Sequence, residues 1–147
     1  MNMRDWRALS IQQPWIDLIL RGVKTIEVRN WRMEVRGPIL LHASAAVDWR
    51  AIELFGYSRP RELPRGKLVG YAEIGETFEF ERSWWLSTAD RHLVLRPLGQ
   101  GNYGSYIENV HAFARPVPCR GRLLLFPIPE NAVPQTRAEL EALDIAW

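Results

Sequence analysis

The side chains best suited by type and spacing to do chemistry lie between positions 22 and 31, in the stretch GVKTIEVRNW. Lys24 is one of only two lysines in a chain whose other 17 basic residues are arginines. Unlike a guanidinium, a lysine amine can lose its proton when buried or crowded by other cations, and it then acts as a base or nucleophile. Glu27 and Arg29 follow it closely. The alternative is an ion-pair ladder on the surface of a strand, which would contribute little to stability.

The same stretch alternates as a β-strand does, with Glu27 and Arg29 on one face and apolar side chains on the other. In this alternation Lys24 would lie on the opposite face of the strand from Glu27 and Arg29. It can join the two charged residues only if the chain turns after Gly22, a turn that glycine permits because it adopts positive φ at no steric cost. Arg29 beside Glu27 would favour the ionised carboxylate.

Three other positions have side chains that could react or bind. His42 ends an apolar strand, where a hydrogen-bonded packing role and a donor facing a cleft both remain open. Glu73, in YAEIGE, is a carboxylate without an obvious acid–base partner in the sequence. Cys119 is the single cysteine, so no internal disulfide is possible and a reducing, cytoplasmic location is expected. No metal-ligand spacing, P-loop or GxSxG motif is present, so we expect neither a metal nor a cofactor.

Length and composition set the broad class. The 147 residues suit a single domain over 1–147, and 47% hydrophobic content is enough for a core. No apolar run could span a membrane, and the N-terminus lacks the apolar segment of a secretory signal. The net charge of +2 and a pI near 9.0 are a mild indication of a polyanionic partner.

Periodicity predicts an α+β domain. The expected strands cover 7–11, 24–31, 37–43, 67–80, 104–113 and 121–128. Gly70 is a bulge candidate in the fourth of them. Helices are expected after Pro14, over 45–56 with Ser44 as the cap, and near the C-terminus behind a capping box of Thr136 and Glu139. Residues 81–102 are assigned to no element. This order favours a small curled or barrel-like sheet, about five to six mostly antiparallel strands, with a few helices outside.

Several segments together resemble a known family. The stretch ALSIQQPWIDLILRGVKTIEVRNW is similar to the N-terminal half of the ASCH (activating signal cointegrator-1 homology) domains. Their opening L-S-x-x-Q-P pattern is followed by G-x-K-x-x-E-x-R, which here reads Gly22, Lys24, Glu27 and Arg29. The segments GPILLHAS, KLVGYAEI and YGSYIENVHAFARPVPCRGRLLLFPIP resemble the later strands of the family. The resemblance covers 8–129 and leaves 130–147 as a C-terminal helical extension.

The resemblance implies a PUA-like β-barrel with a cleft beside it, lined by the G-x-K-x-x-E-x-R residues. The ligands it implies are RNA, single-stranded nucleic acid, or a nucleotide or modified nucleoside. Phosphate contacts and base stacking would be the expected chemistry. The residues predicted to bind are Gly22, Lys24, Glu27, Arg29, His42, Trp15 and Tyr103.

Two alternatives to a binding domain remain open at this point. One is a small hydrolase, with Lys24, Glu27 and Glu73 as its catalytic residues. Some relatives resemble N4-acetylcytidine amidohydrolases with a Lys–Thr–Glu set, but Glu27 stands here where that threonine is expected, which argues against deacetylation. Others are single-strand ribonucleases, an activity that stays open here although their full residue set is not mapped onto this chain. The other alternative is a protein-interaction module in transcription regulation, using exposed Trp84 and Trp85. The sequence does not indicate an oligomeric state.

Overall fold

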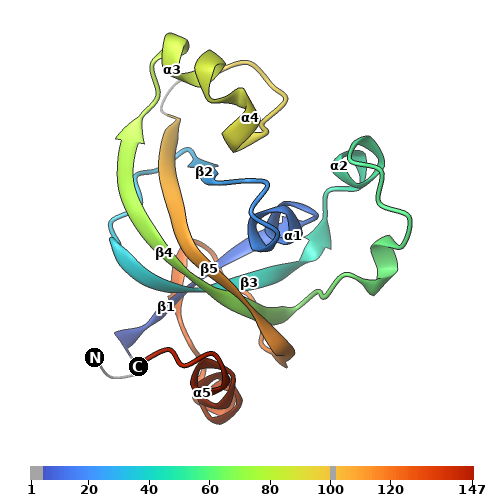
Figure 1. Ribbon diagram of the computed structural model, residues 1–147, viewed down its shortest axis with the longest axis vertical. Helices are drawn as coiled ribbons and strands as arrows, with labels where there is room; N and C mark the ends of the chain where they lie inside the picture. The colour runs from blue at the N-terminus through green and yellow to red at the C-terminus, as the bar shows by residue number, and fades with distance from the viewer. Residues whose placement is uncertain (1–4, 100–101) are drawn as a thin grey trace.

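The computed structural model describes residues 5–99 and 102–147, which form one curled sheet with helices packed on it (Figure 1). The strands are β1 Arg7–Gln13, β2 Ile26–Arg29, β3 Gly37–Val47, β4 Lys67–Glu79, β5 Tyr103–Pro118 and β6 Leu125–Pro127. The helices are α1 Trp15–Leu20, α2 Trp49–Leu54, α3 Arg82–Ser87, α4 Ala89–His92 and α5 Val133–Ala142. Short 3-10 turns cover Pro60–Glu62 (η2) and Glu130–Ala132 (η3).

The six strands are ordered β2-β5-β4-β3-β1-β6. Only β1 and β3 pair in parallel, and the other four neighbouring pairs are antiparallel. The long strands β4 and β5 bend strongly along their length, so the sheet curls without its two edge strands, β2 and β6, pairing with each other (Figure 1). The predicted α+β, PUA-like architecture is confirmed as an open, barrel-like sheet.

Both faces of the sheet are buried, because successive residues of its central strands enter different cores. In β3, Leu40 belongs to the cluster that packs under α5, whereas Leu41 belongs to the cluster around α1. Figure 1 shows α1 in the hollow of the curl and α5 outside it. Burying a leucine side chain contributes about 2 kcal/mol, so these two layers supply much of the stability of the fold.

The turn after α1 is the feature that positions the chemically interesting residues. Gly22 has a φ of +76°, and the main-chain N–H groups of Val23 and Lys24 donate to the carbonyl of Leu18 at 2.9 and 3.1 Å. The chain therefore reverses at the end of α1 before β2 starts at Ile26. The prediction of a glycine-permitted turn at this point is confirmed.

Gly70 marks a bulge in β4, as the sequence predicted. Leu41 pairs with Gly70 and the next residue, His42, pairs with Leu68, so β4 has one more residue than β3 at this point. A Cβ on Gly70 would lie 2.5 Å from the carbonyl oxygen of His111. Only glycine fits here without moving the neighbouring strand.

Two predicted helix caps were wrong. The strand predicted over 37–43 continues to Val47, so Ser44 lies inside β3 and caps no helix. Asp48 caps α2 instead, since its Oδ1 accepts from the N–H of Ala51 at 3.1 Å.

The capping box at the C-terminus was also wrong. The α5 helix already begins at Val133, and the hydroxyl of Thr136 donates within it to the carbonyl of Ala132 at 2.7 Å. Glu139 accepts instead from the N–H of Arg115 on β5 at 2.7 Å.

Several strand bounds also differ from those expected. The strand predicted over 24–31 is limited to Ile26–Arg29, and the one predicted over 121–128 to Leu125–Pro127. In contrast, β5 extends to Pro118. The unassigned stretch 81–102 contains α3 and α4, and its positions 100–101 lie outside the described residues.

Candidate functional site

A cleft of about 1080 Å³ opens at the edge of β1 that β6 leaves unpaired. The pairing of β1 with β6 covers Arg7 to Leu9, and beyond Leu9 no described strand pairs with β1 on this side. The walls come from several parts of the chain. They include positions 10–12, 15, 24, 27–29, 44–45, 48, 50–51, 94–96 and 120–124.

The charged residues of the opening motif meet in one wall of this cleft. The Nζ of Lys24 lies 3.8 Å from Oε1 of Glu27, and the other carboxylate oxygen of Glu27 accepts from both Nε and Nη2 of Arg29, at 3.2 and 2.9 Å. Lys24 and Glu27 are only 3% and 5% exposed, whereas the Arg29 side chain is 27% exposed. The surface ladder considered from sequence does not describe this buried arrangement.

Lys24 is held by three different groups. Its amine donates to the main-chain carbonyl of His92 at the end of α4 and lies 5.4 Å from the ring centre of Trp15. Burial lowers the pKa of the Lys24 amine, the carboxylate of Glu27 opposes that change, and the Arg29 guanidinium adds to it. The amine is therefore easier to deprotonate than an exposed lysine.

Arg29 is the most exposed residue of this group. Besides its two bonds to Glu27, its Nη2 donates to the main-chain carbonyl of Ser10 on β1 at 3.1 Å. Its Nη1 makes no hydrogen bond to any residue that the structure describes. A guanidinium fixed on one side and free on the other is preorganised for an anionic group such as phosphate.

Trp15 forms an aromatic part of the cleft wall. Its indole N–H donates to Oδ2 of Asp48 at 3.0 Å, and its ring meets Phe55 edge-on with a centroid distance of 5.5 Å. Asp48 therefore serves two elements, as the cap of α2 and as the acceptor that orients the indole. A ring held in this way is suited to stacking against a base.

The lining has a strong excess of positive charge. Six cationic residues face two carboxylates, those of Glu27 and Asp48, and both carboxylates already accept hydrogen bonds inside the protein. Among the residues that the structure describes, Arg50, Arg120 and Arg122 form no ion pair. The six cationic residues are Lys24, Arg29, Arg50, Arg96, Arg120 and Arg122.

Four of the predicted site residues do not line the cleft. Gly22 makes the turn before Lys24 and is itself exposed. Tyr103 pairs with Arg29 in the β2–β5 ladder, and Arg32 lies over its ring at 5.1 Å. His42 is completely buried behind Ser10.

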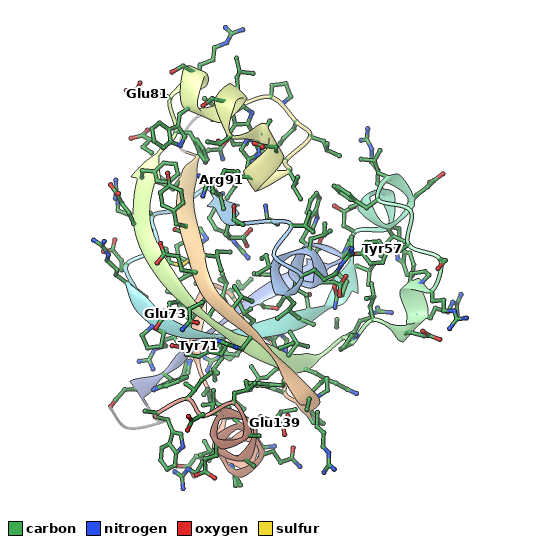
Figure 2. All side chains as sticks on the ribbon, viewed as in Figure 1. Tyr57, Tyr71, Glu73, Glu81, Arg91 and Glu139 are labelled. Carbon is green, nitrogen blue, oxygen red and sulfur yellow. The ribbon has the colours of Figure 1, made fainter. Side chains whose placement is uncertain are left out.

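The fourth, Glu73, is separated from the other predicted catalytic residues. Its carboxylate accepts from the hydroxyl of Tyr71 at 2.9 Å, and Tyr71 belongs to the core cluster under α5. Figure 2 shows the two side chains together on the lower part of the sheet, well below Arg91 of α4, the helix that contacts Lys24. The structure therefore brings Lys24, Glu27 and Arg29 together without Glu73.

Sequence reasoning missed Ser10, Asp48 and the arginines beyond Arg29. Ser10 lies in the LSIQQP stretch itself, so its nearness to the cleft had a local signal. Asp48 precedes WRAIEL and is a common helix-capping residue, a signal that the choice of Ser44 overlooked. The arginines at 120 and 122 come from a loop whose position depends on the whole fold.

The two tryptophans proposed for protein interaction differ in their surroundings. Trp85 is buried and packs edge-on against Phe80 at 5.0 Å, whereas Trp84 is 46% exposed. They do not form a joint exposed patch.

Comparisons with known proteins agree with this fold. The model of the family described as the ASCH domain matches residues 9–117. Human activating signal cointegrator 1 is 28% identical over 78 residues, which cover 46% of this chain and 13% of that protein. This chain thus spans only a small part of that relative's length.

Solved structures show the same fold. ASCH from Zymomonas mobilis superposes with a TM-score of 0.63 at 12% identity, covering 92% of this chain and 95% of that one. A tyrosine-to-phenylalanine mutant of that protein gives a TM-score of 0.61 at 13% identity, covering 92% and 98%. The chain belongs to the ASCH domain family. Among the described residues, none of the helices has the length and hydrophobicity of a membrane-spanning segment.

Proposed function

We propose that the cleft binds single-stranded RNA or another single-stranded nucleic acid, with the phosphates on its arginines and a base against Trp15. The observation that carries this proposal is the position of Arg29, a cleft-lining residue whose Nη2 donates to both Glu27 and the carbonyl of Ser10, so that its guanidinium is held in place. A phosphate contact would then need no rearrangement of the guanidinium.

The charge of the rest of the lining supports the same ligand class. Arg50 on α2 and Arg122 in the loop before β6 approach the cleft from different segments of the chain. Positive charge on several walls suits a phosphate backbone that crosses the cleft more than a single small anion. The family agrees with this proposal, because ASCH domains are in general RNA-binding domains.

The apolar part of the cleft supports a single strand over a duplex. Trp15 in the wall offers a ring surface, and Leu95 and Leu123 at the cleft are 61% and 91% exposed. Apolar and aromatic surfaces contact the faces of bases, which are accessible only when the bases are unstacked. A duplex would present mainly its backbone to these groups.

The test is a titration of the protein with a short single-stranded RNA at several salt concentrations. Binding should be saturable at low salt and weaken as salt rises, because each phosphate contact releases counterions. Arg50→Ala and Arg122→Ala should each reduce the slope of log K against log salt by about 0.7. A matched duplex RNA should bind more weakly than the single strand.

Arg59→Ala is the matched control. Arg59 is 77% exposed, pairs only loosely with Glu62 at 3.8 Å, and lies outside the cleft lining. Its removal changes the net charge by the same amount as Arg50→Ala. If all three variants had the same salt slope, or if no binding occurred at low salt, the cleft would not be the binding site.

A hydrolase centred on Lys24 is the second candidate function, favoured by one observation. Lys24 is among the residues that line the cleft, and burial lowers the pKa of its amine, as is common for lysines that act as bases. Glu27 is less available as its partner, because both oxygens of its carboxylate face groups of the protein. Incubation with N4-acetylcytidine and with labelled single-stranded RNA tests this candidate, and equal product from Lys24→Arg would end it.

A further inference from the structure

A second group with reactive chemistry lies in the wall of the cleft, on β1 and β3. The hydroxyl Oγ of Ser10 is 2.9 Å from Nδ1 of His42, its register partner in the neighbouring strand. The other ring nitrogen of His42, Nε2, is 2.6 Å from the carbonyl oxygen of Cys119. Ser10 lines the cleft, whereas His42 is completely buried.

The partners of His42 determine where its proton is. A carbonyl oxygen only accepts hydrogen bonds, so the Nε2 of His42 must carry the hydrogen that is donated to Cys119. Burial lowers the pKa of His42, and the bond to Cys119 only partly opposes this change. The lowered pKa keeps the ring neutral near pH 7. The lone pair of Nδ1 therefore accepts from the hydroxyl of Ser10. This is the arrangement of a serine nucleophile with its general base.

The carbonyl of Cys119, which accepts from Nε2 of His42, has the role of the group that orients the base in hydrolases with a serine nucleophile. It fixes the tautomer of His42, and it would stabilise the ring after Nδ1 takes up a proton. His42 is completely buried, and Ser10, whose Oγ is hydrogen-bonded to Nδ1, is the member of the pair that lines the cleft.

Gly121 packs closely against both members of the pair, and only a glycine fits at this position. A Cβ on Gly121 would lie 2.7 Å from Cε1 of His42 and 3.2 Å from Oγ of Ser10. Gly121 is itself exposed and lines the cleft. Any larger residue here would displace the His42 ring or crowd the hydroxyl of Ser10.

Positive charge adjoins the serine. Arg29 donates to the main-chain carbonyl of Ser10 at 3.1 Å, and its Nη1 makes no bond to any described residue. Arg120 and Arg122 lie on either side of Gly121 in the sequence and also line the cleft. A substrate that carries a phosphate would be attracted here, and negative charge developing on an oxygen near Ser10 would be stabilised.

We propose that Ser10 and His42 form a nucleophile–base pair that hydrolyses carboxylic esters of phosphate-bearing alcohols, such as an acyl ester on a nucleotide hydroxyl. The Oγ of Ser10 attacks the ester carbonyl carbon while its proton passes to Nδ1 of His42. The bond to the alcohol oxygen then breaks, and that oxygen takes the proton from Nδ1. Water hydrolyses the acyl-serine by the same route and releases the carboxylic acid.

This activity goes beyond the proposed binding of single-stranded nucleic acid and does not depend on it. A reactive serine would be detected with a small probe even if no RNA bound. Conversely, RNA could bind through the arginines in a protein whose serine is inert. RNA titration of the same preparation therefore reports on the binding proposal separately.

The test is labelling of the full chain with a fluorophosphonate, which forms a covalent bond to an activated serine and releases fluoride. We expect one adduct by intact mass, mapped to Ser10 by peptide mass spectrometry. Ser10→Ala should abolish it. His42→Gln, whose amide can still donate to Cys119, should slow it by about 10²-fold or more, because the base is lost while the fold is kept. Gly121→Ala should also slow it, because the added methyl group would push the His42 ring or the Ser10 hydroxyl out of place.

Ser87→Ala is the control, because that exposed serine donates to the carbonyl of Trp84 in its own helix, α3, and lies outside the cleft lining. Circular dichroism checks that each variant folds. An absence of any adduct on Ser10, or the same labelling rate in folded His42→Gln and Gly121→Ala as in the native protein, would overturn the proposal.

The substrate class has its own measurement. An adenosine 5′-monophosphate acetylated on its ribose should be hydrolysed with a kcat/KM at least about 10-fold above that of acetylated adenosine, and Arg122→Ala should reduce this preference. Equal kcat/KM values for the two esters would refute the phosphate-bearing class.

Discussion

Arg29 on β2 donates to the main-chain carbonyl of Ser10 on β1 at 3.1 Å, which joins two strands that are not neighbours in the sheet. Three other strands lie between them in the hydrogen-bonded order. The bond therefore crosses the open side of the curl, where a closed barrel would have a further ladder. It satisfies a carbonyl at the unpaired edge of β1, and it places a cation where the cleft begins.

The bond from Arg29 to the Ser10 carbonyl leads to a prediction for Arg29→Lys, which keeps the positive charge and removes the planar guanidinium. A lysine amine cannot bond Glu27 from two nitrogens and reach the Ser10 carbonyl at the same time. We expect the free energy of unfolding to fall by about 2 kcal/mol, since charge-assisted bonds are lost. Affinity for single-stranded RNA should fall about 10-fold, the loss that one good phosphate contact would cause. Urea unfolding and RNA titration measure the two effects, and Arg59→Lys, on an exposed pair, should change neither.

A second prediction concerns the carboxylate that orients Arg29. Glu27→Gln keeps the shape of the side chain and removes its charge, which leaves Lys24 buried without a counter-charge. Removal of one partner from a buried ion pair typically costs about 3 kcal/mol, and the partial exposure of Arg29 makes this an upper value. Urea unfolding at pH 7 is the measurement. Glu62→Gln, on a pair with both side chains at least 70% exposed, should change stability by less than about 0.5 kcal/mol.

The outcome for Glu27→Gln also tests how Arg29 takes part in binding. If Glu27 orients Arg29 for a phosphate, the variant should lose RNA affinity in parallel with Arg29→Lys. A variant that bound RNA as tightly as the native protein would show that Arg29 does not need its partner to meet a phosphate.

The residues around Lys24 show which parts of the site local sequence can predict. Gly22 predicted the turn, because its positive φ is a property of one residue. The turn then accounts for the contact of Lys24 with Glu27. In one continuous strand these two side chains would lie on opposite faces. Gly70 was predictable for the same reason.

What local sequence could not predict depends on pairing between distant segments. Ser10 and His42 are 32 residues apart, and they meet because β1 and β3 pair in parallel in one particular register. The extension of β3 past Ser44 depends on the same pairing, since Val47 lies opposite Gln13. The long-range pairing of the strands also explains why Glu73 lies away from Lys24, Glu27 and Arg29. Glu73 bonds Tyr71, which belongs to the core cluster under α5 and not to the one around α1.

The start of α5 is a different kind of error. Pro134 lies in the first turn of the observed helix, where proline is favoured because the missing N–H would have no partner. Pro134 therefore indicated the start of the helix, but the capping-box pattern at Thr136 indicated a later start, and the prediction followed the second pattern. A threonine can instead bond the carbonyl four residues before it inside a helix, as it does here.

A third prediction compares the two candidate caps of α2. Asp48→Ala should lower the free energy of unfolding by about 1 to 2 kcal/mol, because the N–H of Ala51 and the indole N–H of Trp15 both lose their acceptor. Ser44→Ala removes only a bond to the N–H of Ala46 and should cost less than about 0.5 kcal/mol. Thermal unfolding measures both, and equal losses would contradict the assignment of Asp48 as the cap. RNA binding should weaken in Asp48→Ala, since the Trp15 ring is no longer held.

The last prediction concerns stability below neutral pH. Both ring nitrogens of His92 are committed in its neutral form: Nε2 donates to the carbonyl of Trp85 at 2.9 Å, and Nδ1 accepts from the N–H of Val94 at 2.9 Å. Burial lowers the pKa of His92, and nearby Lys24 and Arg96 lower it further, against the Trp85 bond and Asp90. Protonation would break the bond from Val94. The pKa of His42 is also lowered, again chiefly by burial.

The sign of the pH effect follows from these directions. A histidine whose pKa is lower in the folded state binds its proton more readily in the unfolded chain, so protons favour unfolding. The contribution is present above about pH 6.5, the ordinary histidine pKa, and is lost as the pH falls through the lower folded values. Urea unfolding between pH 8 and 5 should show stability falling below about pH 6.5, by at most about 1.4 kcal/mol per pH unit for each histidine. His42→Gln should reduce that slope, because one titrating group is gone while its donor to Cys119 can be replaced. A native protein equally stable at pH 5 and pH 7 would contradict the burial of neutral imidazoles on which both the acid sensitivity and the Ser10–His42 pair depend.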